Sequence, residues 1–464
     1  MSSWGLSALG AVRPDNLPHV ADPGIDARVL AFASLLVVGT ALSFGVVPAW
    51  HAARTDVRER LHATPRSATP AGRRLKQGLV VAELALATVL LISAGLLVRS
   101  LIGLLDVERG YRSDNVAAVT VQAWRYYPDL NRRQQFVEET LERVAALPGV
   151  SAAGMASALP LAGEIGQNTT AFAIEGRSLP QADDLPTVRA VAVTSGYFDA
   201  LRIPLRAGRL VQVTDDDDAP RVILINEAMA RRYWADESPL GARVTLGFLG
   251  VRWTAEVIGI VGDTRQTLRE DPPPSLFMPY AQARTGALHF VVRAVGDPTA
   301  LTTAVRQTIA SINPAMPFAG SATLDDLVDD AVRDRRVMMT LLLVFSFTAL
   351  GLAAIGTYGV LSYDATRRSQ EVGIRVALGA GTSSIMRLLV GQGLLFALIG
   401  ISIGAVLTLG VTRLLSRFLF GVAPFDPLTF AATAVLLTCV TVFASYWPAR
   451  RAARVDPMVA LRAD

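Results

Sequence analysis

The sequence contains very few of the residues that form disulfides or bind nucleotide phosphates. Its 464 residues include one cysteine, Cys439, and one lysine, Lys76. A single cysteine cannot form a disulfide within the chain, so any folded domain depends on its own core for stability. A P-loop places a lysine between a glycine and a serine or threonine, whereas Lys76 lies between Leu75 and Gln77. The sequence around this single lysine therefore excludes a P-loop within these 464 residues.

Patterns of catalytic and metal sites are also missing. The acidic run at 215–218 precedes an alanine and a proline, which is more typical of a solvated loop than of a calcium site. Gly259 and Gly262 lack the third glycine of a dinucleotide-binding fingerprint, and no Gly-x-Ser-x-Gly segment occurs. The four histidines lack the spacing of metal ligands; they are His19, His51, His62 and His289. We expect no catalytic residue, no metal site and no cofactor bound by this chain.

Charged residues are scarce and apolar residues are concentrated in long runs. Charged residues make up 18% of the chain, against about 25% in soluble domains, and apolar residues make up 51%. The mean hydropathy is +0.38. Each run is long enough to cross about 30 Å of hydrocarbon as a helix; the runs lie at 29–49, 79–98, 337–361, 385–411 and 428–447. Because buried helices of a soluble protein explain five such runs poorly, we predict an α-helical membrane protein with five transmembrane helices.

Arginines predict the orientation of these helices. They cluster in the linker 50–78, in the loop 362–384 and in the tail 448–464, which share one side of the membrane if all five runs span it. By the positive-inside rule that side is the cytoplasm. The tail 1–28 and the long segment 105–336 then face outward. The same arginines account for the net charge of +4, so we expect no nucleic-acid partner.

The outer segment 105–336 has mixed α and β patterns. An apolar face predicts a helix over 132–147 that ends before Pro148 and Gly149. Asp297 and Pro298 have the residue types of an N-cap and a first helical position. Predicted strands lie at 188–194, 221–225, 255–261 and 290–293. Turn-rich breaks at 179–186 and 271–275 predict two lobes.

Two helices are predicted to leave the membrane together on the outer side. Apolar residues with helical spacing extend the helix 337–361 towards its N-terminal side; they are Leu324, Leu327, Val328, Ala331 and Val332. Leu101, Leu104 and Leu105 extend the helix 79–104 outward past Arg99. Two such helices without a flexible joint would form a stiff stalk.

Three residues within the apolar runs carry further hypotheses. Glu83 is the one acidic residue in them, and intramembrane carboxylates are costly and often functional. It lies near the cytoplasmic end of its helix, so a buried pairing and an interfacial position remain alternatives. Gly400 and Gly404 permit close helix packing, either within the chain or in a dimer.

A repeated segment predicts an internal duplication. The sequence PAWHAARTD at 48–56 recurs as PARRAARVD at 448–456, each time at the basic end of an apolar run. A repeat that includes the membrane exit indicates a duplicated membrane module. We therefore expect the helix 29–49 to be the last helix of a preceding repeat.

The cytoplasmic loop holds the most specific motif. Glu-Val-Gly-Ile-Arg-Val-Ala-Leu-Gly-Ala at 371–380 resembles the signature of FtsX-like and MacB-like ABC permeases at every position. An amphipathic helix lying on the lipid surface is the alternative reading of a basic loop. The resemblance covers 77–464, and segments at 195–198, 222–227 and 257–263 resemble MacB-type periplasmic domains. With the repeat, the chain is most similar to the C-terminal part of acidobacterial duplicated orphan permeases.

The resemblance implies mechanotransmission. A separate cytoplasmic ABC ATPase would bind ATP and push on the coupling loop; the residues concerned are Glu371, Val372, Gly373, Ile374, Arg375, Ala377, Leu378 and Gly379. The motion would open or close the outer lobes around a peptide, lipid or drug-like substrate. The implied setting is the inner membrane, with a dimer or a second permease unit. Two alternatives are an FtsX-like regulator of an external partner and an ATP-independent orphan scaffold.

Overall fold

The computed structural model describes most of the chain. The described residues are 31, 34–35, 37–39, 42, 70–162, 168–177, 186–235, 237–248, 251–367, 381–415, 419–423 and 425–452. They belong to two units, Met1–Lys76 and Gln77–Asp464. In the first unit, the described residues between 31 and 42 are helical. The rest of the predicted helix 29–49, the linker up to residue 69 and the coupling-loop residues 371–379 lie outside the described part.

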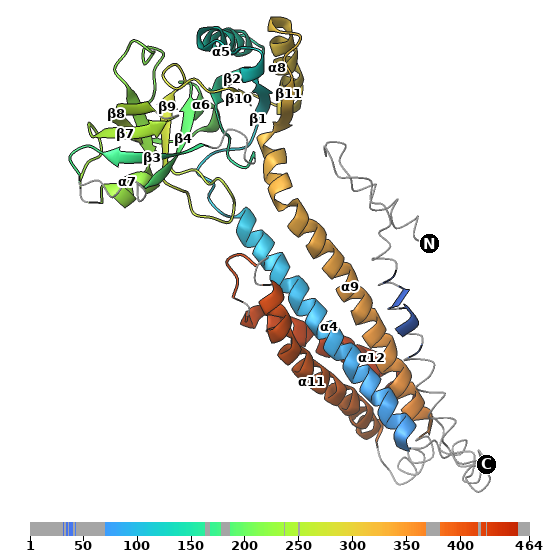
Figure 1. Cartoon of the computed structure of the whole chain (residues 1–464). Coiled ribbons are helices and arrows are strands. Elements are labelled where there is room, and N and C mark those ends of the chain that lie inside the picture. The colour runs from blue at the N-terminus through green and yellow to red at the C-terminus, as the bar shows by residue number, and fades with distance from the viewer. Residues whose placement is uncertain are drawn as a thin grey trace. The chain divides into compact units, whose positions relative to one another are not determined.

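Among the described residues, four helices are long and apolar enough to cross a membrane (Figure 1). They are α4 (Pro70–Leu105), α9 (Leu324–Arg367), α11 (Thr382–Leu415) and α12 (Pro427–Ala452). These helices confirm four of the five predicted membrane helices. At the start of α12 the Asp426 carboxylate accepts a hydrogen bond from the Thr429 backbone amide at 3.0 Å, as in an N-cap. Hydrogen bonds from Thr429 and Arg99 lower the pKa of Asp426 to about 2.

The four membrane helices share an apolar core. Its buried residues come from all four helices: Val80, Leu84, Ala87, Ala353, Leu361, Phe396 and Leu437. Other large apolar residues on the same helices are exposed, among them Phe347 and Phe443. Exposed apolar residues are expected where helices contact lipid rather than water.

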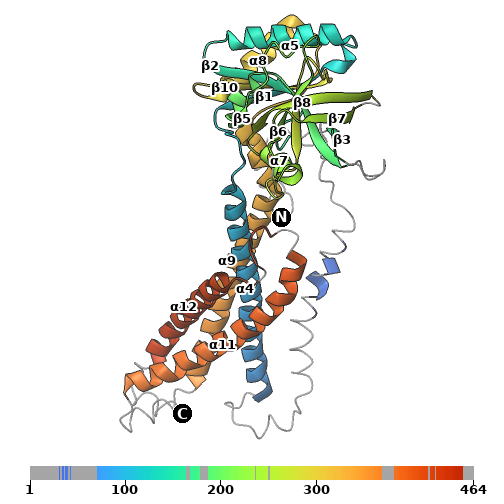
Figure 2. The ribbon, with the colours of Figure 1, turned by 90° about the vertical axis from the view of Figure 1, so that its left-hand side faces the viewer.

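The outer domain begins and ends with one βαββαβ unit, which we call the first lobe. It comprises β1 (Val116–Gln122), α5 (Leu130–Ala145), β2 (Val150–Ala156), β10 (Ala287–Ala294), α8 (Pro298–Ile312) and β11 (Phe318–Thr323), with a short 3-10 helix at Ala123–Arg125. The strands pair antiparallel in the order β11-β1-β10-β2, which is the ferredoxin-like arrangement. Figure 2 shows α5 and α8 on one side of these strands. Asp129 and Asp297 cap the two helices.

The second lobe is inserted between β2 and β10. It contains β3 (Asn168–Ile174), β4 (Thr187–Val193), α6 (Tyr197–Leu201), β5 (Leu205–Gly208), β6 (Val222–Asn226), α7 (Glu227–Tyr233), β7 (Arg243–Phe248), β8 (Val251–Val261) and β9 (Ser275–Pro279). Strands β4-β3-β7-β8-β6-β9 pair in sequence, and β9 pairs with β4, so they close a ring. The predicted breaks at 179–186 and 271–275 connect strands within this ring. The boundary between the lobes therefore differs from the predicted one, and a single pair, Ala156 with Val193, joins their strands.

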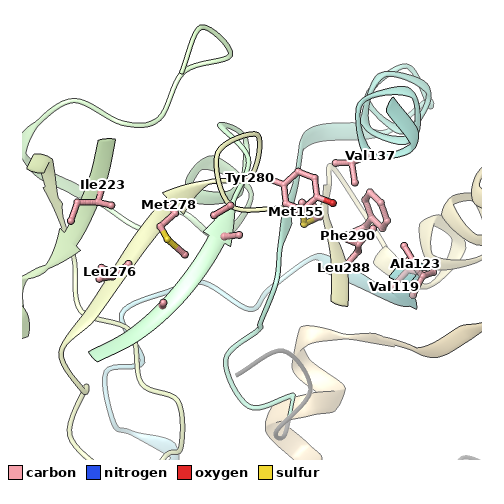
Figure 3. Close-up of a cluster of buried hydrophobic side chains, with 14 of the residues drawn as sticks. Val119, Ala123, Val137, Met155, Ile223, Leu276, Met278, Tyr280, Leu288 and Phe290 are labelled. Carbon is pink, nitrogen blue, oxygen red and sulfur yellow. The ribbon is translucent and has the colours of Figure 1, made fainter. Parts of the chain in front are cut away.

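Alternating side chains divide the outer domain between two apolar clusters. On β1, Val119 and Val121 belong to the larger cluster, whereas Val116 and Ala118 belong to the smaller one. Figure 3 shows the larger cluster, which includes Met155 and Phe290 of the first lobe and Ile223, Leu276 and Met278 of the second. Both lobes therefore share buried apolar contacts.

Candidate functional site

The segment that follows α4 connects the membrane helices to both lobes. We call residues 109–114 the joint. The Arg112 backbone amide donates to the Leu201 carbonyl at 2.9 Å, and the Arg265 amide donates to the Arg109 carbonyl at 2.9 Å. Gly110 has φ +78°, and a Cβ there would lie 1.6 Å from the Asp263 carbonyl oxygen. Only glycine fits this conformation and this contact, so the joint is held tightly against the second lobe.

The joint is also hydrogen-bonded to the first turn of α9. The Ser113 hydroxyl donates to Asp325 Oδ1 at 2.6 Å, and Arg109 Nη1 donates to the Ser113 hydroxyl at 3.0 Å. Asp325 lies where the dipole of α9 favours negative charge. The chain leaving one membrane helix is thus linked by side chains to the start of another.

Arg293 ties the first lobe to the same place. This residue of β10 is 4% exposed. Its guanidinium donates to the carbonyls of Ala200 at 2.7 Å, Asp114 at 2.8 Å and Arg112 at 2.8 Å. Burial lowers the pKa of Arg293, but three acceptors compensate the buried donors. One side chain therefore connects β10, the end of α6 and the joint.

The outer ends of α4 and α9, which form the predicted stalk, are in apolar contact next to the joint. Leu101 and Leu104 of α4 are buried with Val332 of α9 and Leu268 of the second lobe, and Leu105 packs against this cluster. Leu324 and Leu327 contact the smaller outer cluster, and Val328 is buried. Ala331, which shares the helical spacing of these residues, is exposed. The neighbouring Val332 occupies the contact with α4.

The three residues singled out within the apolar runs, Glu83, Gly400 and Gly404, face other helices of the chain. Glu83 Oε2 is buried without a hydrogen-bond partner among the described residues. Gly356 of α9 makes room for it, because a Cβ there would lie 2.3 Å from Oε2. A Cβ on Gly400 would lie 2.6 Å from Leu84 Cβ, and one on Gly404 would lie 2.6 Å from the Ala85 carbonyl oxygen. The two glycines thus contact α4 of the same chain.

The acidic run at 215–218 is only partly the solvated loop that its sequence predicts. Asp216, Asp217 and Asp218 are exposed, but Asp215 is 6% exposed. Its carboxylate accepts two hydrogen bonds of 2.8 Å from the Arg209 guanidinium, which lower the pKa of Asp215. Within the described part of the chain, no group of three or more His, Cys, Asp or Glu side chains could hold a metal ion.

Sequence patterns did not single out the residues of the joint. Ser113 of the joint and Arg293 of β10 are ordinary polar residues in the sequence, and Asp325, Ala200 and Arg112, with which they form hydrogen bonds, are distant from them in it. Gly110 offered one signal, as a glycine shortly after a predicted helix end.

These features define a multi-pass membrane protein with a large extracytoplasmic domain joined to two membrane helices. The family described as MacB-like periplasmic core domain matches residues 78–312, and the family described as FtsX-like permease C-terminal matches residues 343–457. The chain therefore belongs to the FtsX-like permeases of the inner membrane that carry a MacB-like periplasmic core.

Individual relatives are similar over part of their length. The macrolide export ATP-binding/permease protein MacB of Acinetobacter baylyi is 26% identical over 283 residues, which cover 58% of this chain and 41% of the relative. The probable syringafactin export ATP-binding/permease protein SyfD of Pseudomonas syringae pv. tomato is 27% identical over 284 residues, covering 59% and 42%. The periplasmic region of MacB from Actinobacillus actinomycetemcomitans gives a TM-score of 0.34 at 16% identity over 49% of this chain and 97% of that structure. The chain thus matches about two fifths of its curated relatives' length.

Proposed function

We propose that this chain is the permease component of an ABC-type complex that transmits motion across the membrane. A separate cytoplasmic ATPase would drive the coupling loop around Glu371 and Arg375. The extracytoplasmic domain would respond and act on a peptide, lipid or drug-like substrate. The observation that carries this proposal is α9, a single 44-residue helix without proline. It runs from the outer apolar cluster at Leu324 to Arg367, just before the coupling motif.

The joint explains how displacement of the helices would reach the lobes. A movement of α9 relative to α4 acts on the Ser113–Asp325 hydrogen bond and on the apolar contact between Leu104 and Val332. Arg293 connects the same segment to β10 and α6. Packed and hydrogen-bonded groups of this kind respond to displacement as a unit rather than by gradual deformation.

The extent of the MacB-like region favours transport over regulation of an external enzyme. This region matches residues 78–312, and the relatives described above carry names that refer to export. Those names also combine ATP-binding and permease parts in one protein, whereas the 464 residues here contain no P-loop lysine. For this chain the proposal assigns the ATPase to a separate polypeptide.

Purification of the tagged full chain from its native membrane, with and without ATP, tests this function. We expect an ABC ATPase to be retained. Glu371→Ala and Arg375→Ala should weaken its retention at least several-fold, whereas Arg132→Ala, on the exposed face of α5, should not. Retention of a cell-wall hydrolase in place of a substrate-stimulated ATPase would contradict export. Retention of no ATPase in either condition would contradict the coupling itself.

A further inference from the structure

The guanidinium of Arg189 is buried, and two of its three nitrogens have no acceptor among the described residues. Arg189 lies on β4 and is 6% exposed, and its Nε and Nη1 have no hydrogen-bond partner among the described residues. An arginine carries five N–H donors and stays charged, so burial without a partner is costly. Arg293 is equally buried but donates to three carbonyls. This fold can therefore satisfy a buried guanidinium, yet Nε and Nη1 of Arg189 stay without a partner in the described part of the chain.

The neighbours of Arg189 are hydroxyl-bearing residues. In the strand register Arg189 is paired with Thr169 of β3 and with Ser275 of β9, so these three side chains lie on one face of the sheet. Tyr197 of α6 packs on this face, in one buried cluster with Val191 of β4 and with its ring 6.5 Å from that of Phe277 on β9. Burial lowers the pKa of Arg189 to about 10. Ser275 is buried and Thr169 is exposed. The site therefore has donors inside and an edge that reaches solvent.

We propose that Arg189 and Tyr197 form a binding site for an oxyanion, the carboxylate or phosphate group of a ligand. A guanidinium binds either group through two parallel N–H donors. The Tyr197 hydroxyl supplies a further donor, and the ligand's negative charge offsets the cost of the buried cation. Binding here does not require the proposed transport function, because the unsatisfied donors of Arg189 are present in the folded domain by itself.

The site adjoins the joint. Tyr197 and Tyr111 belong to the same buried cluster as Leu324, the first residue of α9. Burial raises the pKa of both phenols. The charges of Arg109 and Asp325 also affect the pKa of Tyr111. An anion held by Arg189 would thus lie next to the buried cluster that also includes the start of α9.

A carboxylate of the chain itself is the competing occupant. Glu164, Asp183 and Asp184 flank β3 and β4 in the sequence and lie outside the described residues. An internal ion pair would make Arg189 structural, because removal of one partner of a buried pair destabilises a protein strongly. The two explanations predict opposite effects when Arg189 is replaced.

Thermal unfolding of the purified full chain in detergent tests the site. The probes are inorganic phosphate and acetate, each compared with chloride at equal ionic strength. We expect at least one of the two to raise the unfolding midpoint of the wild type with saturation, by mass action; the one that does so identifies the group. Arg189→Met should abolish this shift, while Arg132→Met, at an exposed position, should retain it. Tyr197→Phe should weaken the apparent affinity roughly five-fold, as expected for one hydrogen bond.

Measurements without the anion separate the two explanations. In chloride, Arg189→Met should be at least as stable as the wild type, because it removes an uncompensated buried charge. If Arg189→Met fails to fold, Arg189→Lys serves instead, with at least a ten-fold loss of anion affinity expected from the lost two-donor geometry. A chain with Glu164→Gln, Asp183→Asn and Asp184→Asn should keep the anion response. Equal midpoints in all three salts, or a marked loss of stability in this triple variant and in Arg189→Met in chloride, would overturn the proposal.

Discussion

At the scale of single residues, buried charges identify where the extracytoplasmic domain depends on polar contacts. Arg293 and Asp215 are each more than nine-tenths buried, and each has several partners. Arg293 joins segments far apart in sequence, whereas Asp215 closes a local loop through Arg209 and the Gln212 amide. Both have the satisfied donors or acceptors that buried charges need.

Replacement of Asp215 measures the contribution of such a contact. Asp215→Asn should lower the free energy of unfolding by about 1–2 kcal/mol, because charge-assisted hydrogen bonds from Arg209 are lost. Asp218→Asn, at an exposed position of the same run, should change it by less than about 0.5 kcal/mol. Denaturant titration of the full chain in detergent gives both values. Equal effects of the two substitutions would contradict the buried ion pair.

The stability difference between wild type and Asp215→Asn should depend on pH with a defined sign. Hydrogen bonds from Arg209 hold the pKa of Asp215 below its usual value. The stabilisation is therefore complete above the pKa of an unfolded aspartate, about 3.9, and is lost as the pH falls through the lower folded value. The stability difference between wild type and Asp215→Asn should shrink on acidification below about pH 4. A difference that grows there would contradict this account.

At the scale of elements, close contact between α4 and α11 depends on two glycines. Gly404→Ala should destabilise the bundle by roughly 1–3 kcal/mol, because the added methyl group overlaps Thr88 and the Ala85 carbonyl. Gly410→Ala is the matched control, since nothing lies within 4 Å of its Cβ position. It should be neutral or slightly stabilising, because alanine favours a helix over glycine. Similar unfolding midpoints for the two variants in detergent would contradict the observed packing.

The proposed transmission depends on α9 being one continuous helix. Asp330→Gly together with Ala331→Gly, both at exposed positions, should weaken the helix locally by about 1 kcal/mol per residue without removing buried contacts. In the purified complex, ATPase retention should persist, while the nucleotide-dependent change in limited proteolysis of the extracytoplasmic domain should be lost. Asp330→Ala alone is the control, because it removes the ion pair with Arg333 but keeps helix propensity. An unchanged proteolysis pattern in the double-glycine variant would show that α9 need not be rigid.

Elements could be predicted from the sequence where the pattern is local. The apolar runs and the lack of proline predicted α9 as one helix, and the predicted strand at 221–225 matches β6 (Val222–Asn226). The joint could not be predicted, because Arg293 is 93 residues from Ala200 and 181 residues from Arg112. Helical spacing selected both Ala331 and Val332, of which Val332 is buried and Ala331 is exposed, because spacing defines a face but not which residue meets the neighbouring helix. The lobe boundary was missed because turn-rich segments occur within a ring of strands as well as between lobes.

At the scale of the whole molecule, the extracytoplasmic domain is attached to the membrane helices at two places. One is the unbroken passage from β11 into α9, and the other is the joint that follows α4. Relative movement of the two helices would change the hydrogen bonds of the joint before it changes the cores of the lobes, because the cores are close-packed. Hydrogen exchange reports such local opening directly.

Transmission of motion from the ATPase to the extracytoplasmic domain can be measured by hydrogen–deuterium exchange of the wild-type complex. The exchange is compared between the ATP-bound and the nucleotide-free complex. We expect amide exchange in residues 109–114 and in the first turn of α9 to differ between the two nucleotide states. Exchange in strands β1 and β10 should stay the same. Identical exchange at the joint in both states, in a complex that hydrolyses ATP, would contradict this transmission.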